Sequence, residues 1–220
     1  MSDILLILIW VIPTLFAITV HEVAHGWIAY QLGDGSAKMM GRLTLNPIKH
    51  VDPIGTVAVP ALLWFLSAGF IFGWAKPVPV NQAALRRPKQ DMLWVALAGP
   101  GVNFLMAGFW LVVIMLAHSL GNNFLLLMGG AGLFVNILLA IFNLLPIPPL
   151  DGGRVLSALL PRQLAWQYDR LEPYGLFILV GLLYLGIFQQ VVWPIVISLL
   201  QTLSSLSGLN LINLIAQLLN

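Results

Sequence analysis

His21-Glu22-Val23-Ala24-His25 lies inside the first long apolar run of the chain, residues 4–32, and the rest of the sequence is best interpreted from it. Residues four apart share one face of a helix, so the two imidazoles can hold one metal ion from the same side. Glu22 stands beside the first imidazole and can reach a water bound to that metal. This H-E-x-x-H pattern is what a zinc-dependent hydrolase requires. Imidazoles and carboxylates are costly in hydrocarbon, so their place in an apolar run indicates function.

The composition is that of an integral membrane protein. Of the 220 residues, 60% are hydrophobic and 8% are charged, and the mean hydropathy is +0.94; soluble domains carry about 25% charged residues. The absence of cysteine excludes disulfides and thiolate metal sites, so a metal must bind imidazole, carboxylate or carbonyl groups. The ten basic residues are scattered and form no stripe that would indicate nucleic acid. We expect one integral membrane domain over residues 1–220.

Apolar runs separated by turn-rich loops predict an all-α polytopic protein with about five to six transmembrane helices, since about 20 apolar residues cross a bilayer. Residues 4–32, 92–117 and 124–145 are the clear spans. Residues 174–189 form a marginally short span, and residues 191–206 form either a further span or a packed half-helix.

Residues 54–74 are apolar but are interrupted by Gly55, Pro60 and Gly69, and alternating prolines follow in the next residues. Such prolines favour extended backbone. We therefore expect a re-entrant or extended element between the first two full core spans.

Basic residues predict the topology. All ten Lys and Arg fall in residues 33–53, 75–91 and 154–172, and basic loops favour the cytoplasmic side. With the N-terminus outside, all three loops are cytoplasmic, provided that residues 54–74 enter and leave from the same side. We expect an integral protein of a prokaryotic cell (inner) membrane, with its active site toward the cytoplasm.

A third metal ligand is needed, because catalytic zinc sites use three protein ligands and keep a position open for water. Asp151 is the leading candidate, since it follows a span broken by prolines and precedes two glycines that let the loop fold back. His50 and Asp52, in the loop after the motif helix, are the competitors. Their alternative role is to brace that loop.

Three motifs together resemble those of the site-2 protease family of intramembrane metalloproteases. They are H-E-x-x-H at 21–25, A-G-P-x-x-N at 98–103 and N-x-x-P-x-P-x-L-D-G at 143–152. The resemblance covers about residues 4–160, the expected catalytic core, and leaves residues 174–220 as C-terminal helices. It is closest to the compact members of the family, which lack PDZ and CBS domains.

The resemblance implies that His21, His25 and Asp151 bind one Zn²⁺ per chain and that Glu22 is the general base. It also implies that the partners are the lipid bilayer and a transmembrane substrate protein, whose helix is cleaved near the cytosolic face. No nucleic acid is expected as a partner.

Two asparagines belong to the same motifs. Asn143 is expected to donate a hydrogen bond to the substrate backbone or the oxyanion, or else to cap or join helices. Asn103 either helps to position the substrate or packs between helices.

Two other functions fit parts of the pattern. A non-proteolytic metal-binding membrane protein, either a transporter or a silent scaffold, would also carry intramembrane ligands, although transporters often show internal repeats and this chain shows none. A zinc protease of the prenyl-protein-processing type would use a glutamate as third ligand. Glu172 is the only glutamate besides Glu22.

Overall fold

The computed structural model describes residues 3–66 and 73–219, and the regular secondary structure in these residues is helical, with no strand. The main helices are α1 (Asp3–Gln31), α2 (Ser36–Met39), α3 (Val59–Phe65), α4 (Pro88–Ser119), α5 (Asn123–Asn143), α6 (Asp151–Leu159), α7 (Arg162–Asp169), α8 (Gly175–Tyr184), α9 (Ile187–Ser207) and α10 (Leu211–Leu219). Short 3-10 helices are η1 (Pro47–His50), η3 (Gln82–Ala84) and η4 (Glu172–Tyr174), and η2 (Pro53–Ala58) is a short π-helix that leads into α3.

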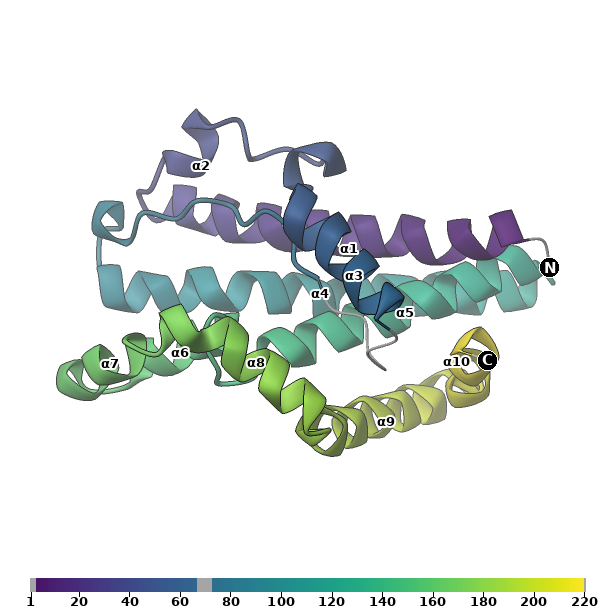
Figure 1. The fold of residues 1–220 in the computed structure, drawn as a ribbon. Coiled ribbons are helices and arrows are strands. Elements are labelled where there is room, and N and C mark those ends of the chain that lie inside the picture. Colours follow the sequence, from purple (N-terminus) through teal and green to yellow (C-terminus); the bar gives the residue numbers. More distant parts are fainter. Residues whose placement is uncertain (1–2, 67–72, 220) are drawn as a thin grey trace.

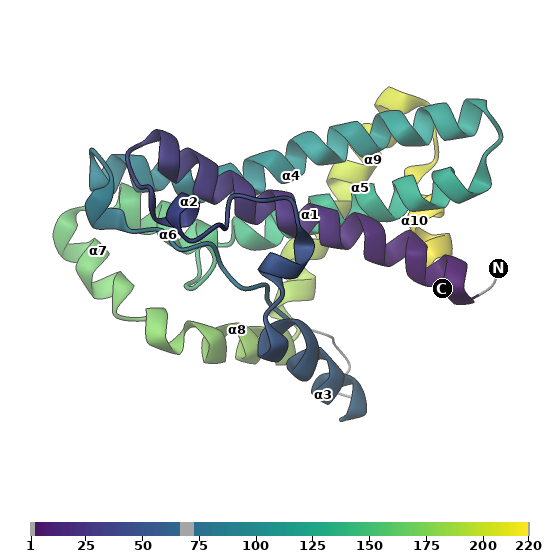
Figure 2. The ribbon, with the colours of Figure 1, turned by 90° about the horizontal axis from the view of Figure 1, so that it is seen from above.

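Helices α1, α4 and α5 lie side by side in alternating directions and form the body of the molecule (Figures 1 and 2). Their shared core includes the buried side chains of Ile9, Ile114 and Leu133. Helices α4 and α5 approach closely because α5 carries Gly132, where an added Cβ would overlap the ring of Trp110. Small residues at such contacts are typical of helix packing in membranes.

Within the described residues, four helices are long and apolar enough to cross a membrane: Ile4–Gln31, Pro88–Ser119, Asn123–Asn143 and Gln189–Ser207. Shorter apolar helical segments, Pro53–Phe65 and α8, accompany them. The predicted class, an all-α polytopic membrane protein, is therefore confirmed.

The predicted marginal span at 174–189 contains the short helix α8, and of the two alternatives for residues 191–206 the further span is favoured, since α9 is long and apolar enough to cross a membrane. Gly186, with φ of 70°, separates the two helices. Helix α8 has 10 residues and is about 15 Å long, too short to cross a hydrocarbon core of about 30 Å. Helix α8 runs toward the end where the two termini lie, and α9, which is long and apolar enough to cross a membrane by itself, continues obliquely from it (Figures 1 and 2).

Residues 55–74 begin and end at the same place, as expected of a re-entrant element. The Trp74 N–H donates to the Gly55 carbonyl at 3.1 Å, whereas the ends of a full span would lie about 30 Å apart. Helix α3 projects from the bundle between these ends (Figure 2). Residues 67–72 of this element lie outside the described part of the chain. Residues 73–81 that follow it are neither helical nor paired as a strand.

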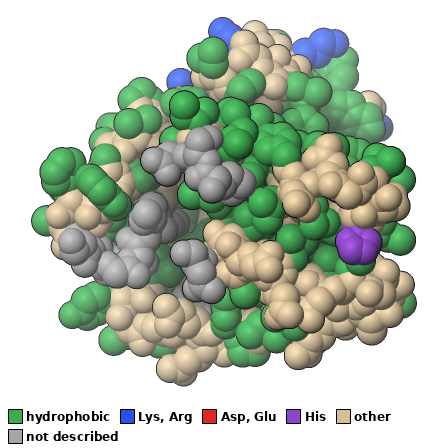
Figure 3. Space-filling view, turned by 90° about the vertical axis from the view of Figure 1, so that its right-hand side faces the viewer, with side chains coloured by type: hydrophobic (Ala, Val, Ile, Leu, Met, Phe, Trp, Pro, Cys, Tyr) green, Lys and Arg blue, Asp and Glu red, His purple; other side chains and the backbone are tan. Residues whose placement is uncertain are grey.

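Charge is separated along the long axis of the molecule. Helix α2, the start of α4, and helices α6 and α7 gather at the end opposite to the termini (Figure 1), and they belong to or adjoin the three basic segments. Seen from the terminal end, the described side chains are mostly hydrophobic or uncharged, apart from a His, and Lys and Arg lie toward the upper margin (Figure 3).

Asp34 ties the end of α1 to the segment that precedes α4. Its fully buried carboxylate accepts hydrogen bonds from the Ser36 N–H at 2.9 Å and the Asn81 N–H at 2.6 Å. Burial would raise the pKa of Asp34, but these hydrogen bonds favour the ionised form and hold the pKa below its ordinary value.

We expect Asp34→Asn to lower the free energy of unfolding by about 1–3 kcal/mol, because one backbone N–H then loses its acceptor in a buried place. Because the folded-state pKa lies below the unfolded one, this contribution is present above the unfolded pKa and is lost as pH falls through the folded pKa. Thermal unfolding of the purified protein at neutral pH measures the effect. Asp169→Asn makes the same chemical change on an exposed carboxylate, and equal losses in the two variants would contradict the assignment.

Candidate metal centre

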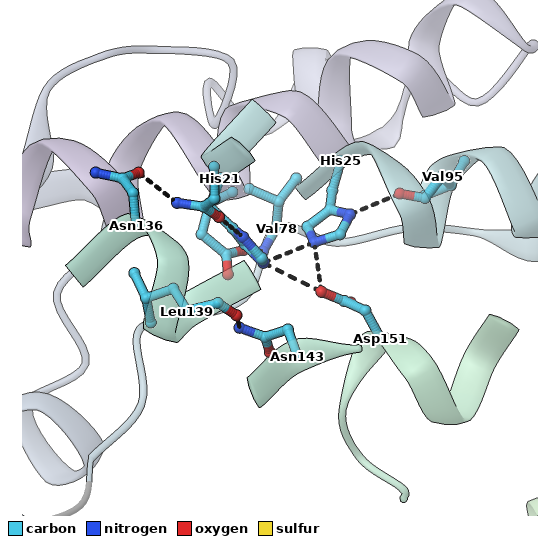
Figure 4. Close-up of polar contacts among 10 residues, drawn as sticks. His21, His25, Val78, Val95, Asn136, Leu139, Asn143 and Asp151 are labelled. Atoms are coloured by element: carbon cyan, nitrogen blue, oxygen red, sulfur yellow. Dashed lines mark hydrogen bonds and ion pairs between the residues drawn. The ribbon is translucent and has the colours of Figure 1, made fainter. Parts of the chain in front are cut away.

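Two helices bring three ligand atoms together. His21 and His25 project from one face of α1, and Asp151 is the first residue of α6 (Figure 4). The two Nε2 atoms are 3.0 Å apart, and each is 3.1 Å from Oδ2 of Asp151. All three side chains are buried. In the described part of the chain, they form the group of His, Asp and Glu side chains that is close enough to hold one metal ion.

The tautomer of His21 is set by a chain of amides that ends on a main-chain carbonyl. The carbonyl of Gly132 can only accept, so Asn136 donates to it through Nδ2 at 2.8 Å. Asn136 Oδ1 then accepts from Asn103 Nδ2 at 2.8 Å, and Asn103 Oδ1 accepts from His21 Nδ1 at 2.5 Å. Each hydrogen bond fixes which end of the next amide donates and which accepts, so the proton of His21 lies on Nδ1.

The tautomer of His25 is set more directly. Its Nδ1 lies 2.7 Å from the carbonyl oxygen of Val95, which can only accept. The proton of His25 is therefore on Nδ1 as well, and its Nε2 carries a lone pair. Such contacts behind a ligating histidine orient the ring toward the metal.

The atoms that face one another are consequently all electron-pair donors: two neutral imidazole nitrogens and one carboxylate oxygen. Three such atoms at 3.0–3.1 Å repel one another unless a cation lies between them. Zinc at about 2.0–2.1 Å from each would separate tetrahedral ligands by about 3.3 Å, close to the spacing found here. The donor set therefore fits a divalent metal ion with a free fourth position.

Gly99 of α4 gives the two imidazoles their room. An added Cβ at this position would lie 2.6 Å from Nε2 of His21 and even closer to Nε2 of His25. A side chain at position 99 would thus enter the space between the ligand atoms. Gly101, two residues further along the same helix, has nothing within 4 Å of such a Cβ.

Asp151 reaches the histidines because the chain turns tightly between α5 and α6. An added Cβ at Gly152 would overlap the carbonyl group of Leu144, and one at Gly153 would lie 2.9 Å from the Pro148 nitrogen. The prolines end α5, and the glycines then let the start of α6 pack against the turn. This explains in physical terms why the broken span delivers a carboxylate at the depth of His21 and His25.

Glu22 lies beside the metal ligands and is held by the main chain. Its Oε2 accepts a hydrogen bond of 2.7 Å from the Val78 N–H. Arg42 fixes this segment in turn, because its Nη2 donates to the carbonyls of Lys76 and Pro77 at 2.9 and 3.3 Å. Glu22 and the three ligands line one cavity of about 630 Å³, which we call the metal cavity.

The two asparagines of the motifs occupy different places. Asn143 lines the metal cavity, but its Nδ2 donates to the Leu139 carbonyl in its own helix at 2.9 Å (Figure 4). Asn103 is completely buried between His21 and Asn136, behind the ligands and away from the cavity wall. Its geometry is that of a side chain joining helices rather than one facing a substrate.

The competing third ligands, His50 and Asp52, lie outside the ligand group. His50 Nε2 donates to the Thr44 carbonyl at 2.9 Å. Asp52 accepts from the Ile54 N–H at 2.9 Å and from Nε1 of Trp74 at 3.2 Å. Both residues brace the loop between α1 and α3.

Sequence reasoning missed Asn136 and Val95. A signal for Asn136 existed, since an amide in the middle of an apolar span usually bonds to another helix. For Val95 there was none, because the acceptor is a main-chain carbonyl and every residue has one.

Comparison with known proteins agrees with this geometry. The sequence profile described as Peptidase family M50 matches residues 117–186. The "Putative zinc metalloprotease YwhC" of Bacillus subtilis (strain 168) is 40% identical over 193 residues, which cover 84% of each chain. The "Putative zinc metalloprotease Rip2" of Mycobacterium tuberculosis (strain H37Rv) is 32% identical over 172 residues, 78% of this chain and 63% of that protein.

"Stage IV sporulation protein FB" of Bacillus subtilis (strain 168) is 28% identical over 151 residues, 67% of this chain and 50% of that protein. No solved structure matches the chain. The similarity to YwhC extends over most of both proteins, and the profile match falls on the segment that carries Asp151. The chain therefore belongs to Peptidase family M50, the site-2 protease family.

Proposed function

We propose that this protein is an intramembrane zinc metalloprotease that hydrolyses a peptide bond in or near the transmembrane helix of a substrate protein. One observation carries the proposal: Nε2 of His21, Nε2 of His25 and Oδ2 of Asp151 lie 3.0–3.1 Å apart, with Glu22 lining the same cavity. Helix α1, which carries the motif, is long and apolar enough to cross a membrane. The relatives named as zinc metalloproteases support the choice of metal.

In this proposal His21, His25 and Asp151 hold one zinc ion per chain. Bound there, zinc would lower the pKa of a water molecule and polarise the scissile carbonyl. The carboxylate of Asp151 supplies the negative charge among the protein ligands. The amide chain behind His21 and the Val95 carbonyl behind His25 keep both rings in the ligating tautomer.

Glu22 is the proposed general base and acid. Because Oε2 is bonded to the Val78 N–H, the side chain is fixed and Oε1 is left to accept a proton from the attacking water. Glu22 then passes this proton to the leaving amine. Asn143 lines the same cavity and is the proposed hydrogen-bond donor to the substrate backbone or the oxyanion. Asn103 has an indirect role in this proposal, because it accepts the hydrogen bond from Nδ1 of His21 and so orients that imidazole.

The distribution of Lys and Arg supports the proposed orientation of the protein in the membrane. The end of α1, the start of α4 and helices α6 and α7 lie together, and the basic residues concentrate in and beside them. By the positive-inside rule this end is cytoplasmic, with the N-terminus outside, in a prokaryotic cell membrane. Glu172, which a prenyl-processing type of protease would need as ligand, lies in η4 and outside the ligand group.

Glu22→Gln tests the mechanism. Glutamine keeps the shape of the side chain and can still accept from the Val78 N–H, but it cannot take a proton from water. We expect cleavage of a transmembrane substrate in liposomes to fall roughly 10²–10⁴-fold, while the zinc content stays at one per chain. Cleavage at the native rate would refute the role of Glu22. If the native protein binds zinc and fragments no membrane protein in a proteomic comparison with Glu22→Gln, a non-proteolytic metal-binding function replaces this proposal.

Gly99→Ala tests the position of the metal. The added methyl group would enter the space between the two Nε2 atoms, so we expect zinc affinity to fall at least about 10-fold, as when a metal's supporting residues are lost. Gly101→Ala makes the same change in the same helix with no neighbour within 4 Å, and it should retain native affinity. Competition with a chromogenic chelator measures both variants. Equal affinities would place the metal elsewhere.

Asn136→Leu tests the amide chain behind His21. Without Asn136 the Asn103 amide is free to turn over, and the proton of His21 is no longer held on Nδ1. We expect zinc to bind roughly 10–100-fold more weakly. Asn213→Leu changes an exposed asparagine of α10 and serves as the control. If Asn136→Leu stays folded and binds zinc as tightly as the control, the proposed tautomer control is wrong.

A further inference from the structure

A second cavity lies beside the metal cavity, next to helices α6 and α7. Its volume is about 740 Å³, within the range of about 300–1,000 Å³ typical of ligand sites. We call it the α6–α7 cavity. Its walls come from residues 77–80, from the turn before α6, from α6 and α7 themselves, and from the start of α4.

The two cavities are neighbours across a common wall. The residues that line both are Pro77, Val78, Val80, Pro149, Leu150 and Arg154. Val78 is also the residue whose N–H holds Glu22, and Leu150 directly precedes Asp151. A peptide bound at the metal therefore has the α6–α7 cavity as its neighbouring space on the charged side of the molecule.

The chemical character changes across this wall. Charged side chains on the α6–α7 cavity are those of Lys89, Arg154, Arg162, Asp169 and Glu172. A membrane-spanning substrate changes in the same direction, from an apolar helix to a polar segment outside the bilayer. Cations and carboxylates together on one wall suit a polypeptide better than a polyanion such as a nucleotide, which Asp169 and Glu172 would repel.

Arg154 lies where the two cavities meet, since it lines both. It lies three residues after Asp151 on α6, so both side chains share a helix face, and it is half-buried. Lys89 on the same cavity donates to the Leu160 carbonyl. In the part of the chain that the structure describes, the guanidinium of Arg154 has no hydrogen-bond or ion-pair partner. A half-buried, unpaired guanidinium is suited to bind a carboxylate through two parallel hydrogen bonds.

We propose that the α6–α7 cavity is a second subsite, which receives the polar segment next to the substrate's transmembrane helix, and that Arg154 binds an acidic side chain of that segment. This inference rests on the proposed protease function, because it names the part of the substrate that lies beyond the scissile bond. It adds a preference that the metal cavity alone does not supply: an Asp or Glu close to the cleaved bond on the cytoplasmic side.

The absence of cysteine from the native chain allows a direct test of the cavity. Ser157→Cys places a single thiol on the wall of the α6–α7 cavity, in the full-length Glu22→Gln protein loaded with zinc. A transmembrane substrate carrying one cysteine in its cytoplasmic flank is added in liposomes, and diamide oxidises the two thiols to a disulfide. We expect strong cross-linking with Ser157→Cys and little with Ser119→Cys, an exposed serine at the far end of α4.

The role of Arg154 is tested with paired substrates that carry Glu or Gln in the flank. We expect the native enzyme to prefer the Glu substrate roughly 10-fold in kcat/KM, as for a hydrogen bond to a charged group. Arg154→Gln should abolish this preference, and Arg154→Lys should restore part of it. Arg87→Gln removes the same charge from an exposed side chain outside both cavities and should retain the preference.

The outcomes separate this inference from the proposed function, because cross-linking requires no cleavage. Equal cross-linking at positions 157 and 119, in a protein whose native form cleaves, would overturn the subsite and leave the protease function standing. Selective cross-linking at position 157 in a protein whose native form does not cleave would support the subsite as a binding site and overturn the protease function. A Glu preference that survives Arg154→Gln would overturn the assignment of Arg154.

Discussion

The structure depends on holding three mutually repelling electron-pair donors within about 3 Å of one another inside apolar helices. Each of the three has its own support. His21 is oriented by the amides of Asn103 and Asn136, which end on a main-chain carbonyl of α5. His25 is oriented by a carbonyl of α4, and Asp151 is delivered by the tight turn before α6. Rigid packing of α1, α4 and α5 is therefore a requirement of the metal centre, because the donors alone would move apart.

The proposed hydrolysis at this centre requires water, and irregular backbone whose polar groups are bonded to protein lines the metal cavity. Non-helical backbone at membrane depth is tolerated only where protein or a wet cavity satisfies it. Residues 73–81 meet this condition, since their main-chain groups bond to Asp34, Arg42 and Glu22. The hydrogen bond to Glu22 thus does two things: it satisfies the N–H of Val78 and it fixes the proposed base next to the ligands.

Sequence patterns within a few residues predicted the features that depend on neighbouring residues in the chain. The spacing of His21 and His25 placed both on one face of a helix, and the prolines before Asp151 predicted a broken span that brings this carboxylate to the same depth. The contacts behind the ligands could not be predicted from the sequence, since the donor-to-acceptor order from His21 to the Gly132 carbonyl exists only when α4 and α5 lie against α1. The break at Gly186 was equally hidden, because a single glycine in an apolar run does not show whether the chain continues or turns.

Helix length lets the start of α4 contribute a charged wall next to the metal cavity. Helices α1 and α4 have 29 and 32 residues, or about 44 and 48 Å at 1.5 Å per residue, against about 30 Å of hydrocarbon. About three turns of each therefore extend beyond the hydrocarbon. At the basic end these turns include the start of α4, where Lys89 and Met92 line the α6–α7 cavity. The metal cavity is lined by α1, α5 and the start of α6, and the α6–α7 cavity by the start of α4 and by α6 and α7, so the two meet at Val78, Leu150 and Arg154. In the proposed reaction, this junction would give the polar segment of the substrate a charged wall beside the metal cavity.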